Sequence, residues 1–444
     1  MTFTSIVRFD EAFAHARAIL AAHAGRLGGR FVLIRDVQGC ISVLTDIAPG
    51  ADATALAQAL STQLGAFGGT PEEVLLFPDD FFDAERLFRS PDARPLFPPG
   101  HDEAVAGHVL LLEREITGLD WMRAPLPVPD ASGKEAPRMT FFGVKGGVGR
   151  STALTLAARA LARAGSRVLI VDLDLESPGL GPLLLPADST PRFGILDYLV
   201  EEAVGQDDDA LLSDMVARSP LVEPDRGAIL VAPATGVGGH YLAKLGRAYQ
   251  SAASTDGARE LAERVDRMIS RLSRREDADV VLIDSRAGLH DVAAFAVTRL
   301  RAQSLLFGAA AEPMFHGYRL LFEEWRDHPN LSAFRDKLRM VAALVPEADR
   351  TAYLDRFLAA SHHLFSTTLY EAAPAQVAGG EARFHFDLHD ATAPHHPLAI
   401  SWSRALQEFD PVSRPGAAPD ARVIEAAGAF CSQVGALLKR EVAL

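Results

Sequence analysis

A glycine-rich stretch, GVKGGVGRS at residues 143–151, joins two runs of different character and constrains the fold more than any other feature of the chain. The run before it, RMTFFGV (138–144), is apolar and suits a buried strand. The run after it, STALTLAARALARAG (151–165), suits a helix that Gly165 ends. A strand, a glycine loop and a helix therefore follow one another directly, which is one unit of an alternating α/β fold.

The same alternation continues beyond this unit. Further strands are expected at 167–174, 227–233, 278–288, 302–310 and 338–346, and helices at 261–276 and around 291–301. Apolar strands that alternate with helices are typical of a mostly parallel sheet with helices on both faces. The pattern predicts an α/β main domain over residues 138–444, which ends in a C-terminal helical extension.

The first 122 residues have a different organisation. RFVLIRDV and CISVLTDI are expected to pair as strands around Gln38 and Gly39, between a helix that begins near Asp10 and a second helix with an apolar stripe. EVLLF (73–77) and HVLLLERE (108–115) are expected to be further strands. No glycine loop, metal-ligand spacing or nucleophile motif occurs there, so we interpret residues 1–122 as a smaller α/β or α+β domain that docks a partner. The proline-rich residues 123–137 are expected to be a linker.

Composition limits the possible partners and the compartment. The net charge of −14 disfavours binding to nucleic acid or anionic lipid unless a local basic patch exists. Cys40 and Cys431 are the only cysteines and form no C-x-x-C pair, which fits a reducing cytoplasm. No apolar run is as long as a membrane span, and the N-terminus has no signal-peptide pattern.

The glycine loop has the spacing of a phosphate-binding loop, G-x-x-x-x-G-K-[ST], with one substitution. Gly143 and Gly149 keep the spacing, Ser151 keeps the hydroxyl, and Arg150 stands where lysine is usual. Glycines let backbone N–H groups surround a phosphate, and the helix that begins at Ser151 and Thr152 adds partial positive charge. The Ser151 hydroxyl is a candidate ligand of Mg²⁺. A glycine-rich turn that binds nothing is the alternative.

KGGVGRST (145–152) resembles the deviant Walker A loop of the ParA/MinD/ArsA-like P-loop ATPases, K-G-G-x-G-K-[ST], in its arginine-containing variant. The resemblance covers about residues 138–345 and implies a SIMIBI-type P-loop NTPase fold that binds ATP and Mg²⁺. The residues that it assigns to nucleotide binding are Gly143, Lys145, Gly146, Gly147, Val148, Gly149, Arg150, Ser151 and Thr152.

Two aspartate-containing segments match the switch regions of the same family. In VLIVDLDLESPGL, the resemblance makes Asp174 the residue that orients the attacking water and Asp172 a member of the Mg²⁺ shell. In DVVLIDSRAGLHD, it makes Asp284 a second member of that shell, together with Ser151. Aspartates that only cap strands are the alternative. A serine-hydrolase interpretation of Ser285 and its neighbours His290 and Asp291 is disfavoured, because no G-x-S-x-G elbow is present.

The resemblance also assigns roles to the two basic residues of the loop. Lys145 would contact the nucleotide of a partner subunit, and Arg150 would hold the β- and γ-phosphates in its own subunit, so both count as catalytic candidates with Asp174. A lysine that acts across an interface implies a homodimer or a heterodimer with a related chain. Arginine keeps the charge but changes its geometry, so binding should survive better than hydrolysis. Many relatives read adenine with an asparagine where this chain has Val345 and Pro346, which leaves base choice open.

Three further stretches each allow a purely structural and a functional interpretation. The histidine-rich residues 384–398 could share a metal, but their alternation and prolines favour a strand or loop. The C-terminal residues 423–444 form an amphipathic helix that could touch a membrane, although packing against the domain is favoured. Arg271, Arg274 and Arg275 could contact DNA, although a solvated helix face is favoured.

The leading prediction is a bacterial, cytoplasmic, ATP-dependent dimeric switch of the ParA/MinD type. It would hydrolyse ATP slowly to ADP and phosphate and regulate a protein partner through the N-terminal domain. One alternative is a scaffold or regulatory subunit that binds ATP without hydrolysing it. Another is an ATPase that positions DNA or membrane cargo.

Overall fold

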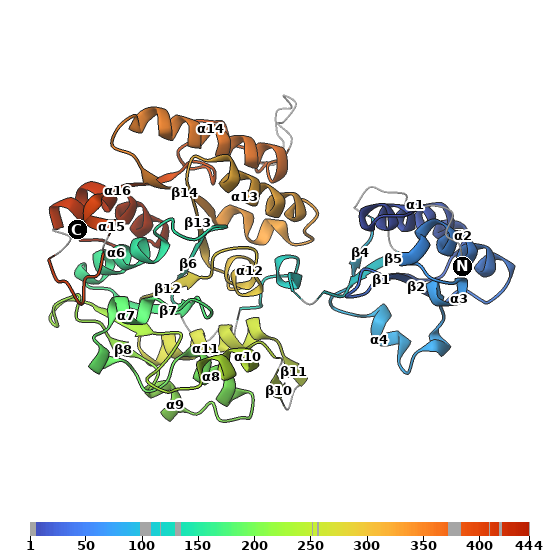
Figure 1. Cartoon of the computed structure of the whole chain (residues 1–444), viewed down its shortest axis with the longest axis horizontal. Helices are drawn as coiled ribbons and strands as arrows, with labels where there is room; N and C mark the ends of the chain where they lie inside the picture. The colour runs from blue at the N-terminus through green and yellow to red at the C-terminus, as the bar shows by residue number, and fades with distance from the viewer. Residues whose placement is uncertain are drawn as a thin grey trace. The chain divides into compact units, whose positions relative to one another are not determined.

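The computed structural model describes residues 6–97, 108–115, 117–128, 135–250, 252–254, 257–371, 383–407, 409–416 and 420–443. These residues form two compact units, Met1–Leu119 and Asp120–Leu444 (Figure 1). Each unit has its own sheet and its own buried core.

The first unit is a mixed five-stranded sheet in the order β3-β2-β1-β5-β4. Its elements are α1 (Phe9–Leu27), β1 (Phe31–Arg35), β2 (Ile41–Thr45), α2 (Ala51–Leu64), α3 (Pro71–Val74), β3 (Leu75–Leu76), α4 (Ala84–Phe88), β4 (Arg94–Pro95) and β5 (Val109–Glu113). Strand β1 runs antiparallel to β2, as the sequence predicted, and parallel to β5. The expected strand over EVLLF shrinks to β3, because Pro71 and a Thr70–Glu73 capping box start the short helix α3 just before it.

Apolar residues cover both faces of this small sheet. Alternate strand residues such as Phe31 and Leu33 pack with α1 and α2, while Val32 packs with Phe88 of α4 on the other face. The turn between β1 and β2 needs Gly39, since its φ of 86° is left-handed and a Cβ would lie 2.8 Å from the Phe9 ring. The unit is thus a self-contained core.

The second unit is built on an eight-stranded sheet in the order β15-β14-β13-β6-β12-β7-β9-β8. Its strands are β6 (Arg138–Phe142), β7 (Arg167–Leu173), β8 (Ala217–Arg218), β9 (Ala228–Ala232), β12 (Val280–Ser285), β13 (Gln303–Gly308), β14 (Leu338–Val345) and β15 (Leu398–Ser401), with β10 (Ala252–Ser254) and β11 (Gly257–Arg259) as a separate hairpin. Its helices are α6 (Arg150–Arg163), α7 (Leu180–Leu184), α8 (Ile195–Glu202), α9 (Asp209–Ser213), α10 (Tyr241–Ala248), α11 (Leu261–Arg275), α12 (Asp291–Thr298), α13 (Glu312–Trp325), α14 (Arg350–Thr368), α15 (Arg404–Gln407) and α16 (Asp420–Leu438).

The predicted mostly parallel sheet with helices on both faces is confirmed. Among the described strands of this eight-stranded sheet, only β8 pairs antiparallel to its neighbour. In β7, Val168 and Ile170 face the core that contains α6 and α16, while Leu169 and Val171 face the core that contains α8 and α11. Figure 1 shows α6 and α16 on one side of the sheet and α8 and α11 on the other. Because β6, β7 and β12 are parallel, their carboxyl ends meet at one edge of the sheet, where the glycine loop begins.

The boundary between the units lies slightly earlier than the predicted linker. Residues 120–128 already pack on the second unit: the Trp325 Nε1 donates to the Trp121 carbonyl at 3.1 Å, and the Leu126 N–H donates to the Arg299 carbonyl at 3.0 Å. Residues 129–134 of the predicted linker lie outside the described residues. Proline content alone did not reveal that part of this segment is packed.

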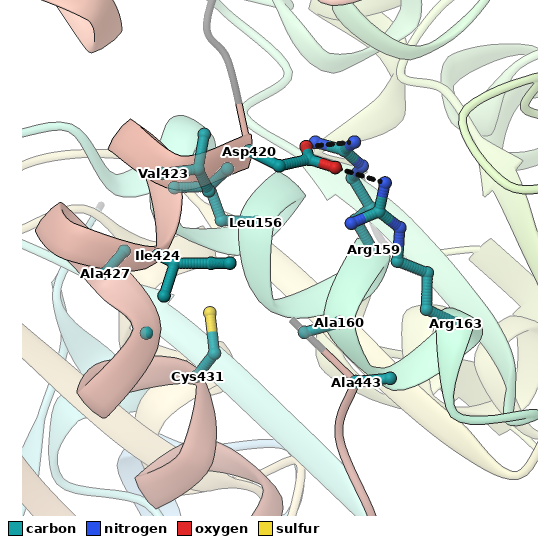
Figure 2. Close-up of a pocket in the computed structure, with 11 residues that line it drawn as sticks. Leu156, Arg159, Ala160, Arg163, Asp420, Val423, Ile424, Ala427, Cys431 and Ala443 are labelled. Atoms are coloured by element: carbon teal, nitrogen blue, oxygen red, sulfur yellow. Dashed lines mark hydrogen bonds and ion pairs between the residues drawn. The ribbon is translucent and has the colours of Figure 1, made fainter.

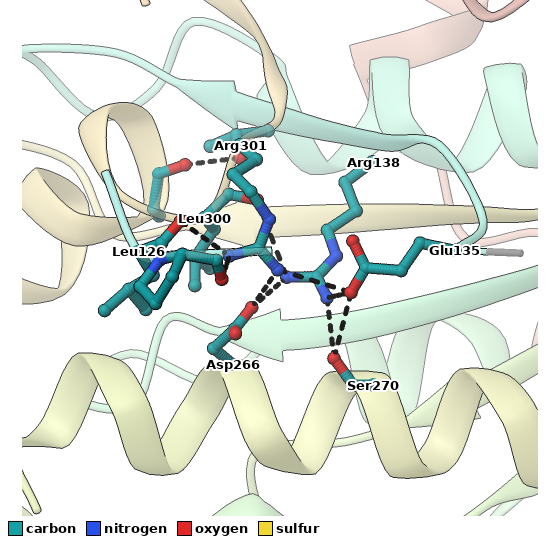
Figure 3. Close-up of polar contacts among 10 residues, drawn as sticks. Leu126, Glu135, Arg138, Asp266, Ser270, Leu300 and Arg301 are labelled. Atoms are coloured by element: carbon teal, nitrogen blue, oxygen red, sulfur yellow. Dashed lines mark hydrogen bonds and ion pairs between the residues drawn. The ribbon is translucent and has the colours of Figure 1, made fainter. Parts of the chain in front are cut away.

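A buried ionic cluster fixes the chain where it enters the central strand. Arg138, the first residue of β6, and Arg301 converge on Asp266 of α11, and Arg301 lies 2.9 Å from it (Figure 3). Arg138 also donates to Ser270 at 2.9 Å and to Glu135 at 3.2 Å. Removal of one member would leave a buried charge without compensation, so the cluster holds the entry to β6 in place.

Helix α16 packs along α6 rather than standing alone. Asp420 lies between Arg159 and Arg163 of α6, at 2.6 and 3.0 Å, above a small apolar pocket of about 20 Å³ (Figure 2). This volume holds a water molecule at most. Among the described helices, α16 is the one whose length and composition would suit a membrane span, but core helices pass the same test and its Phe430 and Val434 are fully buried.

Candidate nucleotide-binding site

The glycine loop leaves an open cradle between β6 and α6. Gly147 and Gly149 have left-handed φ angles of 77° and 78°, which residues with a Cβ rarely adopt. A Cβ placed on either of them, or on Gly146, would meet no atom within 4 Å. Gly143 differs, because a Cβ there would lie 3.3 Å from the Lys145 carbonyl and 3.4 Å from that of Phe307. The first glycine therefore allows close packing and the later ones shape an open turn.

The N-terminus of α6 opens into this cradle. Gly149 occupies the N-cap position, no side chain caps the first turn, and that turn contains no acidic residue. Ser151 and Thr152 are partly exposed there, whereas Val148 is buried in the core and offers only its backbone to a ligand. Free N–H groups and the helix dipole at such a terminus suit an anion.

Two buried carboxylates lie beside each other below the loop. Asp172 at the end of β7 and Asp284 in β12 are direct partners in the parallel register, and they are 0% and 2% exposed. The Ser151 hydroxyl donates to Asp284 Oδ2 at 2.6 Å, and the other oxygen of Asp284 is buried without a partner among the described residues. The structure thus brings together the three residues predicted for the metal shell.

Asp172 also has a role within its own loop. Its carboxylate accepts the N–H groups of Asp174 at 3.2 Å and Leu180 at 3.3 Å. These bonds shape the turn after β7 and leave Asp172 as the more structural of the two buried carboxylates.

Burial disfavours the charged forms of this pair. It raises the pKa of Asp172 to about 8, and the neighbouring Asp284 carboxylate adds to the effect. It also raises the pKa of Asp284 to about 6, against the opposing influence of Arg150 and Ser151. A divalent cation with oxygen ligands would satisfy the unpaired Asp284 oxygen and favour the ionised forms, so these residues fit Mg²⁺.

The described residues contain no cluster of three or more His, Cys, Asp or Glu side chains arranged to hold a metal by themselves. Mg²⁺ does not require one, because it usually takes one or two protein oxygens and completes its shell with water and phosphate. Within the described region, the histidine-rich stretch likewise contains no such cluster. His395 is buried and uses both ring nitrogens, one with the Tyr370 hydroxyl at 2.5 Å and one with the Leu388 carbonyl at 3.0 Å.

The two basic residues of the loop have opposite environments. Arg150 is 8% exposed, its guanidinium donates to the Ser285 carbonyl, and it lies 3.6 Å from Asp174 Oδ2. Lys145 is exposed, and its ammonium group makes no hydrogen bond or ion pair with any described residue. Arg150 therefore already joins the loop to both aspartate-containing segments, while Lys145 is available to another molecule.

Asp174, in the first of these segments, uses only part of its hydrogen-bonding capacity. Burial raises the pKa of its carboxyl, and Arg150 opposes that change. Its Oδ1 is buried and has no partner among the residues that the structure describes.

A second contact to the glycine loop comes from the Gly288 N–H, which donates to the Gly143 carbonyl at 3.0 Å. The segment after β12 is thus bound directly to the start of the glycine loop.

Three other residues considered for function, Ser285, His290 and Arg271, make contacts that do not suit the considered roles. The Ser285 hydroxyl points to the Arg286 carbonyl at 3.4 Å, and His290 Nδ1 accepts the Val292 N–H, so these residues form no nucleophilic triad. Arg271, one of the arginines considered for DNA, is bound to Asp207 at 2.7 Å and to Asp209 at 3.1 Å.

Three residues near the two aspartate-containing segments form a group that the sequence did not predict. Glu176, Arg286 and Tyr249 come into contact through their side chains. Arg286 could have been noticed inside DSRAG and Glu176 just after D-x-D, but Tyr249 follows α10 and carries no sequence signal.

Residues 139–312 match the family model described as the CobQ/CobB/MinD/ParA nucleotide binding domain. This segment is a nucleotide-binding domain of that family. The predicted kinship with ParA/MinD-like P-loop ATPases is therefore confirmed for it. The matched residues include the whole glycine loop, Asp172, Asp174 and Asp284, and lie entirely within the second unit. No curated protein matches the chain.

Several solved structures resemble this chain at low identity. pNOB8 ParA bound to nonspecific DNA is 17% identical, with 69% of this chain and 98% of that chain covered and a TM-score of 0.41. A ParA family ATPase from Chlorobium tepidum TLS is 14% identical, with 67% and 99% covered and a TM-score of 0.43. Cobyrinic acid a,c-diamide synthase from Mycobacterium smegmatis, with bound ADP and magnesium, is 17% identical, with 70% and 100% covered and a TM-score of 0.40.

Proposed function

We propose that this chain is an ATP- and Mg²⁺-dependent dimeric switch that hydrolyses ATP slowly and reports its nucleotide state to a protein partner. The observation that carries the proposal is the pairing of Ser151 with Asp284 directly below an open glycine loop. Phosphate would meet the backbone N–H groups of the loop while the metal-shell oxygens lie beneath it.

Each side chain of the site has a separate task in this mechanism. Backbone N–H groups at the start of α6 bind the phosphate oxygens, and Arg150 supplies positive charge from within the subunit. Bound Mg²⁺ would neutralise charge on the β- and γ-phosphates. Ser151 and Asp284 would hold the ion, and Asp172 would keep the loop in place. Asp174, with its unpaired oxygen, would orient a water for attack on the γ-phosphorus, which releases ADP and phosphate.

The contacts of Arg150 support slow hydrolysis. Its guanidinium already donates to the Ser285 carbonyl and lies near Asp174. To face a γ-phosphate it must give up or share these partners, and a misfit of about 1.4 kcal/mol in the transition state slows the reaction about tenfold. The same contacts favour the alternative in which the chain binds ATP without turning it over.

Dimerisation and partner binding rest on less specific features. The exposed Lys145 could reach a nucleotide in a second subunit, and the separate core of residues 6–97 suits a docking module. The net charge of −14 and the occupied Arg271 disfavour DNA as cargo. We place the protein in the cytoplasm.

Calorimetry with ATP, in the presence of Mg²⁺ or of EDTA, tests the central claim. Mg²⁺ should tighten binding at least about tenfold, or 1.4 kcal/mol. Ser151→Ala should remove most of this gain, whereas Ser366→Ala on the exposed surface of α14 should keep it. Equal affinities in Mg²⁺ and EDTA would contradict the assigned roles. A single-turnover assay then separates the switch from the scaffold, because the scaffold would form no ADP.

A further inference from the structure

One carboxylate near the site connects three separate segments of the chain. Glu176, two residues after Asp174, lies 2.8 Å from the Arg286 guanidinium in the segment after β12. The same oxygen, Oε1, accepts the hydroxyl of Tyr249, which ends helix α10, and lies 3.7 Å from His290 Nε2. Glu176 therefore joins the loop after β7 to the segment after β12 and to α10.

Helix α10 has further contacts with the same region. The Tyr241 hydroxyl, in the first turn of the helix, donates to the Leu175 carbonyl. The Tyr249 ring packs edge-on against His290, with 5.7 Å between ring centroids. Burial and the Glu176 carboxylate both raise the pKa of Tyr249, so its hydroxyl remains a donor at neutral pH. Both ends of α10 are thus bound to the two segments that flank the site.

The two carboxylate oxygens of Glu176 differ in their contacts. Its side chain is 18% exposed, and Oε1 receives all of these donors, while Oε2 is buried and unpartnered among the described residues. A pair that served stability alone would be expected to satisfy both buried oxygens. The Oε2 atom of Glu176 remains available as an acceptor beside Arg286, whose side chain is one-third exposed. Glu176 can therefore exchange one hydrogen-bond donor for another.

A direct chain of contacts leads from Glu176 to the phosphate cradle. Arg286 follows Ser285, whose carbonyl accepts the Arg150 guanidinium, and the Gly288 N–H binds the Gly143 carbonyl of the loop. If Arg150 turns towards a phosphate, Ser285 loses its donor and the Arg286 backbone is free to shift. That shift would act on Glu176 and then on Tyr249.

We propose that Glu176 is a positioning residue that couples nucleotide occupancy to helix α10. It does this through Arg286 on one side and Tyr249 on the other, without contact to the nucleotide. Helix α10 carries Leu242, which is 77% exposed, so its response reaches the protein surface. The inference rests on the proposed ATP-binding function and adds its path of regulation.

Hydrogen exchange with and without a non-hydrolysable ATP analogue and Mg²⁺ tests the coupling. In the parent chain, the analogue should change amide exchange both in the loop, residues 143–152, and in residues 241–250. Glu176→Gln weakens the pair with Arg286, and Tyr249→Phe removes only the hydroxyl. Both variants should keep the change in the loop, lose at least about half of the change in α10, and bind the analogue within about threefold of the parent.

Glu323→Gln on α13, an exposed glutamate of the second unit, is the matched control and should behave as the parent does. Calorimetry on the same samples separates the two claims. Two results would overturn the coupling and leave the proposed function intact. One is that the parent chain binds the analogue without a change of exchange in α10. The other is that both variants show a change in α10 as large as that of the parent. Absence of binding in the parent chain would overturn the proposed function and the coupling with it.

Discussion

Replacement of Arg150 by alanine tests whether the unusual residue of the glycine loop acts from a buried position. The guanidinium is 8% exposed, donates to the Ser285 carbonyl and lies 3.6 Å from Asp174. Alanine would remove both contacts and leave a buried carbonyl and a mostly buried carboxylate without their cation. The nucleotide-free protein should therefore lose stability before any effect on ATP is considered.

The expected loss follows from these two contacts. A hydrogen bond from a charged donor contributes about 1.5–3 kcal/mol, and breaking a buried ion pair costs about 3–5 kcal/mol. The pair with Asp174 is loose at 3.6 Å, so it should cost less than a close buried pair, and we expect a total loss of about 2–4 kcal/mol. Arg150→Lys keeps the charge but cannot serve both acceptors, and should lose only about 1 kcal/mol.

Urea unfolding followed by tryptophan fluorescence is the appropriate assay. The three tryptophans of the chain, Trp121, Trp325 and Trp402, all lie in the second unit, so the signal reports that unit alone. Arg274→Ala, which removes an exposed arginine from α11, is the control and should change stability by no more than about 0.5 kcal/mol.

The same variants should separate binding from catalysis. Arg150→Ala should weaken ATP binding at least about 100-fold, or 2.7 kcal/mol, while Arg150→Lys should stay within about tenfold and change the single-turnover rate more than the affinity. If Arg150→Ala unfolds at the same urea concentration as Arg274→Ala and binds ATP as the parent does, Arg150 neither bridges the segments nor faces the phosphates.

Further predictions concern dimerisation, pH and the entry to the central strand. Lys145→Ala should weaken analogue-dependent dimerisation in light scattering at least about tenfold more than it weakens analogue binding, and normal dimerisation would refute the role across the interface. The raised pKa values of Asp172 and Asp284 mean that the nucleotide-free folded chain binds more protons than the unfolded chain, so its stability should fall as pH rises from about 4 to about 8. Asp172→Asn should flatten that urea-unfolding profile, and an unchanged slope would contradict the shift. Asp266→Asn should destabilise the second unit by about 3 kcal/mol in the same assay, because Arg138 and Arg301 lose their shared carboxylate, and a loss below about 0.5 kcal/mol would show that the cluster is not structural.

The sequence by itself determined the local elements of the second unit. Uniformly apolar runs predicted β6, β7, β9, β12, β13 and β14, and all of them occur close to the expected residues. The glycine loop and the N-terminus of α6 were also predictable, because left-handed backbone conformations and a helix start depend on neighbouring residues. In the first unit, EVLLF forms a strand only over Leu75–Leu76, because the capping box before it starts the short helix α3.

Only the tertiary structure decided which of these residues meet. Asp172 and Asp284 are far apart in the sequence and become neighbours because β12 inserts between β6 and β7. That strand order depends on the packing of whole helices and strands, which no local pattern encodes. The buried position of Arg150, the contact of Tyr249 with Glu176 and the packing of residues 120–128 have the same origin. Each contact joins segments whose separate sequences carry no information about their distance in space, and long-range packing alone sets that distance.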